Sequence, residues 1–121
     1  MMKQSRDHAS ENRVAYENGA TRSEKLERYD LIPPEADEAL AERFGLGAGK
    51  HGETNWKSGG AAFIKACINH ARAHEVNLLA TAGECADDDL AAILCNYAML
   101  AWFRKHKTSE YAQALRELRG T

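Results

Sequence analysis

The sequence predicts an all-α protein, a compact bundle of three to four helices. Three observations support this class: apolar residues recur at helical spacing in four segments, no segment alternates as a half-buried strand would, and glycine-containing breaks separate the first three segments. A chain of 121 residues has the length of one domain. We expect residues 1–27, which carry almost no large apolar residues, to form a flexible or extended arm, and residues 28–121 to form the helical domain.

Local signals give the bounds of the expected helices. They are predicted over residues 34–44, 61–75, 87–105 and 109–119. Pro34 suits the first turn of a helix, and Ser109 is a suitable N-cap. Glycines from Gly45 onward are expected to end the first helix and to open a long loop over residues 45–60. The third segment is apolar on nearly all sides, which predicts a central, buried helix.

Composition and charge exclude several classes of protein. The chain is 44% hydrophobic and 28% charged, and its apolar runs are far shorter than the roughly 18 residues of a membrane span. The net charge of −2 provides no field that would attract duplex nucleic acid. No secretion signal precedes Cys67, Cys85 and Cys95, so we expect reduced thiols and a cytoplasmic protein, bound to neither membrane nor duplex nucleic acid.

A stripe of carboxylates marks the first expected helix. Glu35, Glu38 and Glu42 fall within about 60° of one another on a helical wheel. Like charges that close repel one another unless a cation lies between them, and Mg²⁺ prefers carboxylate oxygens. The alternative interpretation is a solvated acidic face.

A second acidic group opens the third expected helix. Asp87, Asp88 and Asp89 follow Glu84, and Asp87 lies on the same side of the helix as Leu94. A carboxylate directed toward packed surface needs a partner, and a metal ion would serve. The alternative is an N-terminal cap that answers the helix dipole.

The glycine-rich segment combines groups suited to an anionic, aromatic ligand. Glycine amides approach phosphate oxygens closely, and Lys50 and Lys57 add positive charge. Trp56 is either a stacking surface for a base or a core anchor. Asn96 lies inside the apolar helix, where its amide contacts either a ligand or a neighbouring backbone.

A separate possibility is a small zinc-stabilised helical domain. Cys67, His70 and His74 are spaced by one turn each, and their side chains are of the types that zinc prefers. A buried core histidine is the alternative interpretation of His70.

An ordered series of short motifs resembles the dATP/dGTP diphosphohydrolase N-terminal family, many of whose members are encoded by phages and prophages. The motifs are Gly19-Ala20-Thr21-Arg22, Arg28-Tyr29-Asp30-Leu31-Ile32-Pro33-Pro34, Gly47-Ala48 with Lys50 and Gly52, Asn55-Trp56, His70, Gly83, Asp88, Leu90-Ala91-Ala92 and Asn96. Two positions depart from the pattern. The family commonly has Arg-His where this chain has Asn69-His70, and Asp-His-Leu-Ala where this chain has Asp88-Asp89-Leu90-Ala91.

The resemblance implies a MazG-like, all-α nucleoside-triphosphate pyrophosphohydrolase. Such an enzyme splits a purine deoxynucleoside triphosphate, dATP or dGTP, into the monophosphate and pyrophosphate with Mg²⁺ or Mn²⁺. MazG-like enzymes use ExxE and ExxD patterns, which Glu35-xx-Glu38 and Glu84-xx-Asp87 fit. They are usually dimers or tetramers with sites completed across subunits, so we expect a homodimer or homotetramer.

These inferences assign a role to each candidate residue. The expected metal ligands are Glu35, Glu38, Glu42, Asp87 and Asp88; the expected catalytic residues are Glu38, Glu84, Asp88 and His70; the expected substrate-binding residues are Arg28, Lys50, Asn55, Trp56, Lys57 and Asn96. The rival from another class is a non-catalytic helical interaction module, in which the acidic stripe is solvated and the glycine-rich segment is a docking surface.

Overall fold

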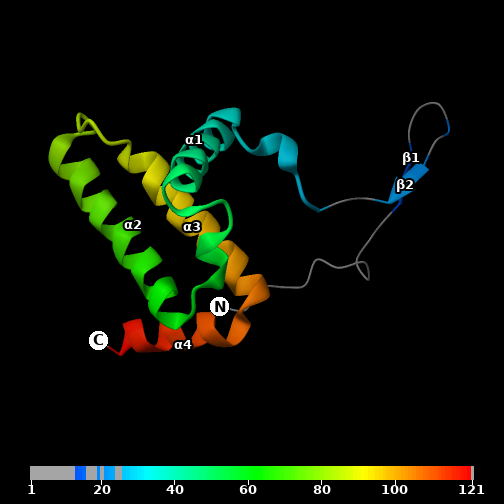
Figure 1. Ribbon diagram of the computed structural model, residues 1–121. Coiled ribbons are helices and arrows are strands. Elements are labelled where there is room, and N and C mark those ends of the chain that lie inside the picture. The colour runs from blue at the N-terminus through cyan, green and yellow to red at the C-terminus, as the bar shows by residue number, and fades with distance from the viewer. Residues whose placement is uncertain (1–12, 16–18, 20, 24–25, 121) are drawn as a thin grey trace. The chain divides into compact units, whose positions relative to one another are not determined.

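The computed structural model of the chain describes residues 13–15, 19, 21–23 and 26–120, and it divides into two units that meet between Pro33 and Pro34 (Figure 1). The expected boundary lay earlier, between residues 27 and 28. Much of the expected arm, residues 1–27, lies outside the described residues, so its flexibility stays a prediction.

The described part of the first unit contains a short hairpin. Strand β1 (Arg13–Ala15) pairs antiparallel with strand β2 (Thr21–Ser23), with Val14 opposite Arg22. A single 3₁₀ turn, η2 (Tyr29–Leu31), follows, and the Ile32 N–H donates to the Tyr29 carbonyl at its end.

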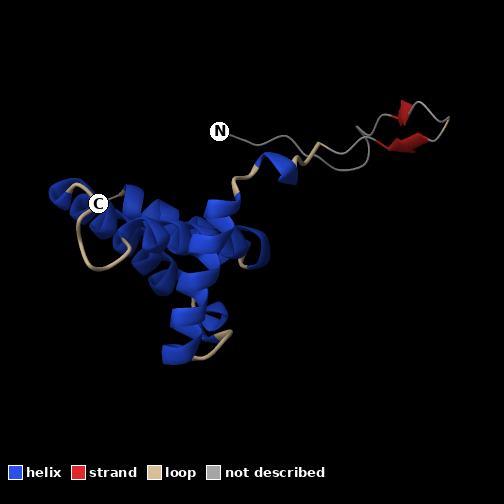
Figure 2. Ribbon diagram, turned by 90° about the horizontal axis from the view of Figure 1, so that it is seen from above, coloured by secondary structure: helices blue, strands red, loops and turns tan. Residues whose placement is uncertain are grey.

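The second unit confirms the predicted all-α bundle. Its four helices are α1 (Pro34–His51), α2 (Ala61–Thr81), α3 (Asp89–His106) and α4 (Thr108–Arg119), with the 3₁₀ turn η3 (Asn55–Ser58) between the first two (Figures 1 and 2). Helix α3 contacts the other three helices and is therefore the central element, as its apolar sequence predicts.

The core lies where α2, α3 and α4 meet. Ile64 and Phe103 are fully buried there, together with Cys67, Leu100 and Ala114. The Phe103 ring contacts Trp56, Phe63 and Trp102, with ring centroids 5.3–5.9 Å apart. This aromatic group fixes η3 against α3 and so positions the segment that follows α1.

The expected end of the first helix at Phe44 is wrong, because α1 continues through three glycines to His51. A glycine in a helix costs roughly 1 kcal/mol relative to alanine, a penalty that tertiary contacts routinely outweigh. Here Phe44, Gly47 and Ala48 are half-buried, and Phe44 packs on Trp56. The helix ends at Gly52, whose φ of +94° is a left-handed conformation that favours glycine.

Replacing Gly45 or Gly49 by alanine is expected to stabilise the protein by about 0.5–1 kcal/mol each, measured by urea unfolding. A Cβ at either position meets no atom within 4 Å, so the substitution adds helix propensity without a clash. Gly52→Ala is the matched control, since its positive φ predicts a loss of stability. A loss of stability with Gly45→Ala and Gly49→Ala would mean that α1 is not helical across these residues.

Helix α2 is also longer than predicted, and this matters for the site. It ends at Thr81, followed by Ala82 and Gly83 in the left-handed conformation, and the Gly83 N–H donates to the Leu78 carbonyl. The expected helix stopped at residue 75. The additional turns carry Asn77 on the same side of the helix as His74. In the part of the chain that the structure describes, no helix has the length and apolar character needed to cross a membrane.

Candidate functional site

A pocket of about 370 Å³ opens in the helical unit, between the second half of α1, the turn η3, and the facing sides of α2 and α3. Its volume lies in the range of small-molecule sites. Residues that line it are Arg43, Phe44, Leu46, Gly47, Ala48, Lys50, His51, Gly52, Glu53, Asn55, Trp56, Phe63, Ala66, Cys67, His70, Cys95, Asn96 and Met99. The first part of the glycine-rich segment, residues 45–51, was expected as a loop and is instead a helical wall of the pocket.

The α1 wall of the pocket carries three basic residues, Arg43, Lys50 and His51. Arg43 lies one turn after Leu40 on the inner side of α1, whereas Lys50 and His51 occupy its exposed last turn. One acid, Glu53, lines the pocket beyond them. The excess of positive charge on this wall suits an anionic ligand.

Aromatic and amide groups form the other walls. Trp56 packs against Phe44 and Trp102, with ring centroids 6.0 and 5.2 Å away, so it is a core anchor that also presents a surface to the pocket. Asn55 lines the pocket beside it. Asn96 reaches the pocket from α3, and its Nδ2 donates to the Ala92 carbonyl at 2.8 Å.

Two buried thiols, those of Cys67 and Cys95, line the pocket. Burial raises the pKa of Cys67 to about 11, with a smaller contribution from Cys95, and burial also raises the pKa of Cys95. Both thiols are therefore protonated near neutral pH. This protonation state makes them poor nucleophiles and suits them to packing.

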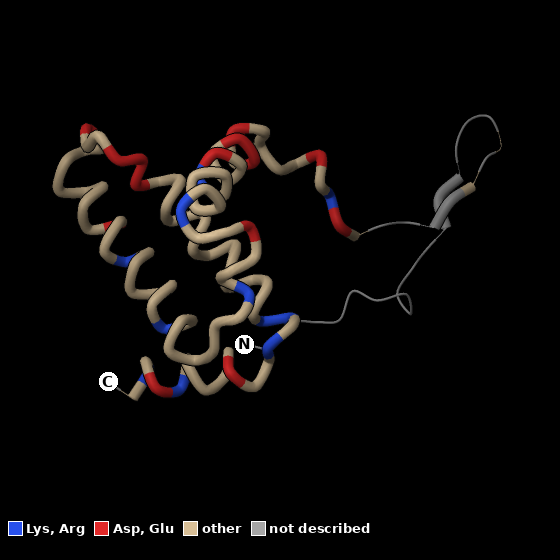
Figure 3. The backbone as a smooth tube through the Cα atoms, viewed as in Figure 1, with Lys and Arg blue, Asp and Glu red and all other residues tan. Residues whose placement is uncertain are grey.

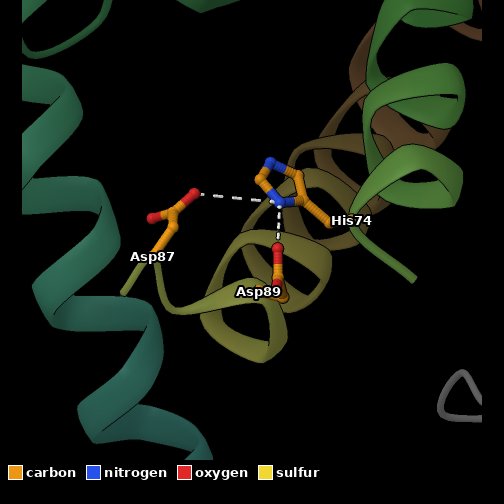
Figure 4. A group of neighbouring side chains, drawn as sticks. All are labelled: His74, Asp87 and Asp89. Atoms are coloured by element: carbon orange, nitrogen blue, oxygen red, sulfur yellow. Dashed lines mark hydrogen bonds and ion pairs between the residues drawn. The ribbon is translucent and has the colours of Figure 1, made fainter. Parts of the chain in front are cut away.

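A polar group made of His74, Asp87 and Asp89 lies beside the pocket; we call it the His74 cluster (Figure 4). Nδ1 of His74 is 2.8 Å from Oδ1 of Asp89 and 3.9 Å from Oδ2 of Asp87. In the tautomer that carries its proton on Nδ1, His74 donates this hydrogen bond to the Asp89 carboxylate. Asn77 Nδ2 donates to the second oxygen of Asp89 at 2.8 Å.

The three consecutive aspartates have three different environments. Asp89, the first residue of α3, is only 3% exposed and faces α2. Asp88 is exposed and caps α3, since its Oδ1 accepts from the Ala91 N–H at 3.0 Å. Asp87 is also exposed, and its Oδ1 accepts from Arg43 at 2.8 Å. That hydrogen bond is the main reason why the pKa of Asp87 lies below its usual value.

Arg43 connects the pocket with the His74 cluster. Arg43 lines the pocket, and its guanidinium group is ion-paired with Asp87, which belongs to the cluster. The arrangement therefore places a cationic cavity next to a group of carboxylate and imidazole atoms that all lie within 4.8 Å of one another.

The sequence profile of the family described as dATP/dGTP diphosphohydrolase, N-terminal, matches residues 16–113. The chain belongs to this family. No curated protein and no solved structure matches the chain.

Five of the catalytic and substrate-binding residues expected from the sequence line one pocket. Lys50, Asn55, Trp56, His70 and Asn96 all line it. Lys57 is not among the lining residues. Its Nζ instead lies 5.5 Å from the Trp56 ring and 5.4 Å from the Trp102 ring, in cation–π contact.

The carboxylates of α1 do not meet the aspartates of α3 within one chain. Glu35, Glu38 and Glu42 are exposed, on the opposite side of α1 from the half-buried Leu40 and Gly47. Figure 3 shows acidic residues both on α1 and in the segment that leads into α3. The residue of α1 that reaches that segment is Arg43 rather than a glutamate.

Two further candidates lie outside the pocket lining. Glu84 is exposed in the connection between α2 and α3. Arg28 belongs to the first unit, where its guanidinium pairs with Asp30 at 2.8 Å.

The spacing that suggested zinc does not produce a zinc site. Cys67 is buried in the core, His70 is exposed at the pocket, and His74 is bonded to Asp89. Among the described residues, the potential ligand atoms that converge are those of the His74 cluster.

Sequence reasoning missed Arg43, His51 and the pairing of His74 with Asp89. Arg43 was detectable, because it follows Leu40 by three positions and therefore lies on the apolar side of α1. The pairing of His74 with Asp89 gave no such local signal, since it depends on how α2 packs against the start of α3.

Proposed function

We propose that the chain hydrolyses a purine deoxynucleoside triphosphate, dATP or dGTP, to the monophosphate and pyrophosphate with the help of a divalent cation. Membership of the dATP/dGTP diphosphohydrolase family supports the reaction. The observation that carries the assignment to a site is the contact of Arg43 with both the cationic pocket and the His74 cluster.

Different pocket residues suit the phosphates, the base and the sugar of a nucleotide. Arg43 and Lys50 would neutralise phosphate charge on the α1 wall, and His51 would offer a hydrogen bond to a phosphate oxygen. Trp56 offers an aromatic surface for the base, and Asn55 and Asn96 offer amides for sugar or base atoms. In the reaction, water adds to the α-phosphorus and the bond to the bridging oxygen breaks, releasing pyrophosphate.

The His74 cluster has a donor set that fits a divalent cation. One imidazole nitrogen and two carboxylates supply ligands that suit Mn²⁺, whereas Mg²⁺ more strictly prefers oxygen. An ion bound to Nδ1 would replace the proton that His74 now shares with Asp89. Such an ion would lower the pKa of a bound water and stabilise charge on the phosphate oxygens.

His70 is the imidazole on the α2 side of the pocket, and we assign it proton transfer or orientation of the substrate. Asp88 caps α3 and is not among the ligand atoms that converge at the His74 cluster, whereas Asp89 is, so Asp89 takes the ligand role that the sequence gave to Asp88. Within one chain this arrangement gives no role to Glu35, Glu38, Glu42 or Glu84, all of which are exposed.

The test is a panel of all eight triphosphates incubated with the purified chain and Mn²⁺ or Mg²⁺, with products separated by chromatography. We expect conversion of dATP or dGTP to the monophosphate and pyrophosphate. Intact triphosphates, with circular dichroism showing a folded helical protein, would contradict the proposal and favour the non-catalytic module. That rival also predicts no Mn²⁺ site stronger than millimolar.

Lys50→Gln is expected to raise KM for the triphosphate by a factor of about 10 to 100, since a charge-assisted contact contributes roughly 1.5–3 kcal/mol. Lys105→Gln is the matched control, because Lys105 is exposed on α3 and does not line the pocket. Equal KM values for the two variants would mean that Lys50 does not bind the substrate.

We also propose that the chain self-associates as a homodimer or homotetramer. Large apolar side chains stay exposed on neighbouring helices: Val76 and Leu79 on α2 are 67% and 77% exposed, and Leu90 and Tyr97 on α3 are 55% and 47% exposed. Light scattering is expected to give a multiple of 13.4 kDa, and Tyr97→Glu to lower that mass. A monomeric mass at micromolar concentration would contradict the proposal.

A further inference from the structure

Arg43 lies where its charge affects two ligands, an anion in the pocket and a cation at the His74 cluster. Its side chain is 24% exposed, it lines the pocket, and its Nη1 donates to Oδ1 of Asp87 at 2.8 Å. The other carboxylate oxygen of Asp87 faces Nδ1 of His74 at 3.9 Å, inside the His74 cluster. A single guanidinium group thus lies at the boundary between a pocket suited to anions and a cluster suited to a cation.

The contact with Asp87 opposes the binding of a cation. Asp87 and Asp89 bring two carboxylates to the cluster, and Arg43 already compensates part of that charge. A divalent ion placed between the aspartates would lie close to the guanidinium, and like charges at that separation repel strongly in a partly buried site. Release of Asp87 by Arg43 would remove this repulsion and free a carboxylate oxygen.

An anion in the pocket would compete with Asp87 for the guanidinium group of Arg43. A guanidinium group carries five N–H donors in a planar fork that matches the spacing of phosphate oxygens. Lys50 and His51, on the same wall, add to the attraction for a phosphate. Arg43 can therefore exchange one anionic partner, the Asp87 carboxylate, for another that enters the pocket.

We propose that Arg43 couples the two sites, so that an anion carrying phosphate groups in the pocket draws Arg43 from Asp87 and thereby strengthens binding of a divalent cation at the His74 cluster. The inference rests on the proposed function, because it places the cation at this cluster. Linkage requires that the coupling be reciprocal, so the cation strengthens anion binding by the same factor. The triphosphate and its cation would then bind together rather than separately.

Mn²⁺ binding tests the coupling without any measurement of turnover. Free Mn²⁺ is followed by its electron paramagnetic resonance signal during titration of the full chain, with and without inorganic phosphate, and a blank without protein corrects for Mn²⁺–phosphate complexes. For the wild type we expect phosphate to lower the Kd for Mn²⁺ about tenfold. For Arg43→Gln we expect a Kd without phosphate several-fold lower than that of the wild type, and a phosphate effect of less than twofold.

Two further variants separate the coupling from general charge. Arg72→Gln removes an exposed positive charge elsewhere on α2 and is expected to retain the tenfold phosphate effect. Arg43→Lys keeps the charge but loses the fork, so we expect a reduced phosphate effect with a nearly unchanged Kd in the absence of phosphate. Circular dichroism establishes that each variant is folded, and Arg43→Lys provides the test if Arg43→Gln does not fold.

Failure of the coupling and failure of the proposed function give different results. If wild type and Arg43→Gln bind Mn²⁺ equally, with equal phosphate effects, the coupling is overturned while the metal site and the hydrolysis stand. If the folded wild type binds no Mn²⁺, or if Asp89→Asn binds it as tightly as the wild type does, the cation site itself is overturned, and the coupling falls with it.

Discussion

Replacing Asp89 by asparagine is expected to lower the rate of triphosphate hydrolysis by a factor of about 100 or more and to weaken Mn²⁺ binding by a similar factor. The substitution keeps the shape of the side chain but removes its negative charge. It also replaces one of the two carboxylate oxygens by an NH₂ group. The amide then has a single acceptor oxygen, whereas the carboxylate has one for His74 and one for Asn77. Hydrolysis kinetics and Mn²⁺ titration measure the two effects.

Asp89→Asn is also expected to lower the free energy of unfolding by about 1–3 kcal/mol, because the part-buried hydrogen bonds that the carboxylate makes with His74 and Asn77 are weakened. Urea unfolding measures this loss separately from activity.

Asp88→Asn is the matched control for Asp89→Asn. Asparagine caps a helix about as well as aspartate, and Asp88 is exposed, so we expect little change in stability or in Mn²⁺ affinity. The opposite pattern, with Mn²⁺ binding lost in Asp88→Asn and retained in Asp89→Asn, would move the cation to the ligand predicted from the sequence.

Phe103→Ala is expected to lower the free energy of unfolding by about 3–5 kcal/mol. Phe103 is fully buried, and its ring contacts Trp56, Phe63 and Trp102, so truncation leaves a cavity at the centre of the aromatic group. The shift of the urea midpoint at constant slope measures the loss. Because Trp56 packs on this ring, we also expect weaker binding of nucleotide in the pocket.

Two control variants give losses of unfolding free energy with which the Phe103→Ala loss can be compared. Phe103→Leu keeps part of the buried volume and is expected to cost less than the alanine variant. Lys105→Ala, at an exposed position on the same helix, is expected to change stability by no more than about 0.5 kcal/mol. A loss as small as that in Phe103→Ala would mean that the core does not depend on this ring.

The fold was predictable because its signals are local. Helical spacing of apolar residues, an apolar third segment and the break at Gly83 predict three to four helices with the third at the centre, and the structure has four with α3 at the centre. Helix ends were less predictable. The three glycines of α1 were expected to stop it, but helix propensity is a small penalty, and the packing of Phe44 against Trp56 outweighs it.

The pocket was predictable in part for the same reason. Lys50, Asn55 and Trp56 are close in sequence, so any compact arrangement of that segment keeps them near one another. His70 and Asn96 join them because α2 and α3 pack face to face. The sequence pattern gave the chemical types, and helix packing gave the enclosure.

The sequence by itself determined that the chain forms helices, that carboxylates gather at two places, and that it belongs to the family described as dATP/dGTP diphosphohydrolase, N-terminal. Only the tertiary structure decided which charges meet. Arg43 and Asp87 are 44 positions apart, and His74 and Asp89 are 15 positions apart. Such pairs form when apolar surfaces dock and fix the rotation of each helix about its axis, which no local spacing of charges specifies.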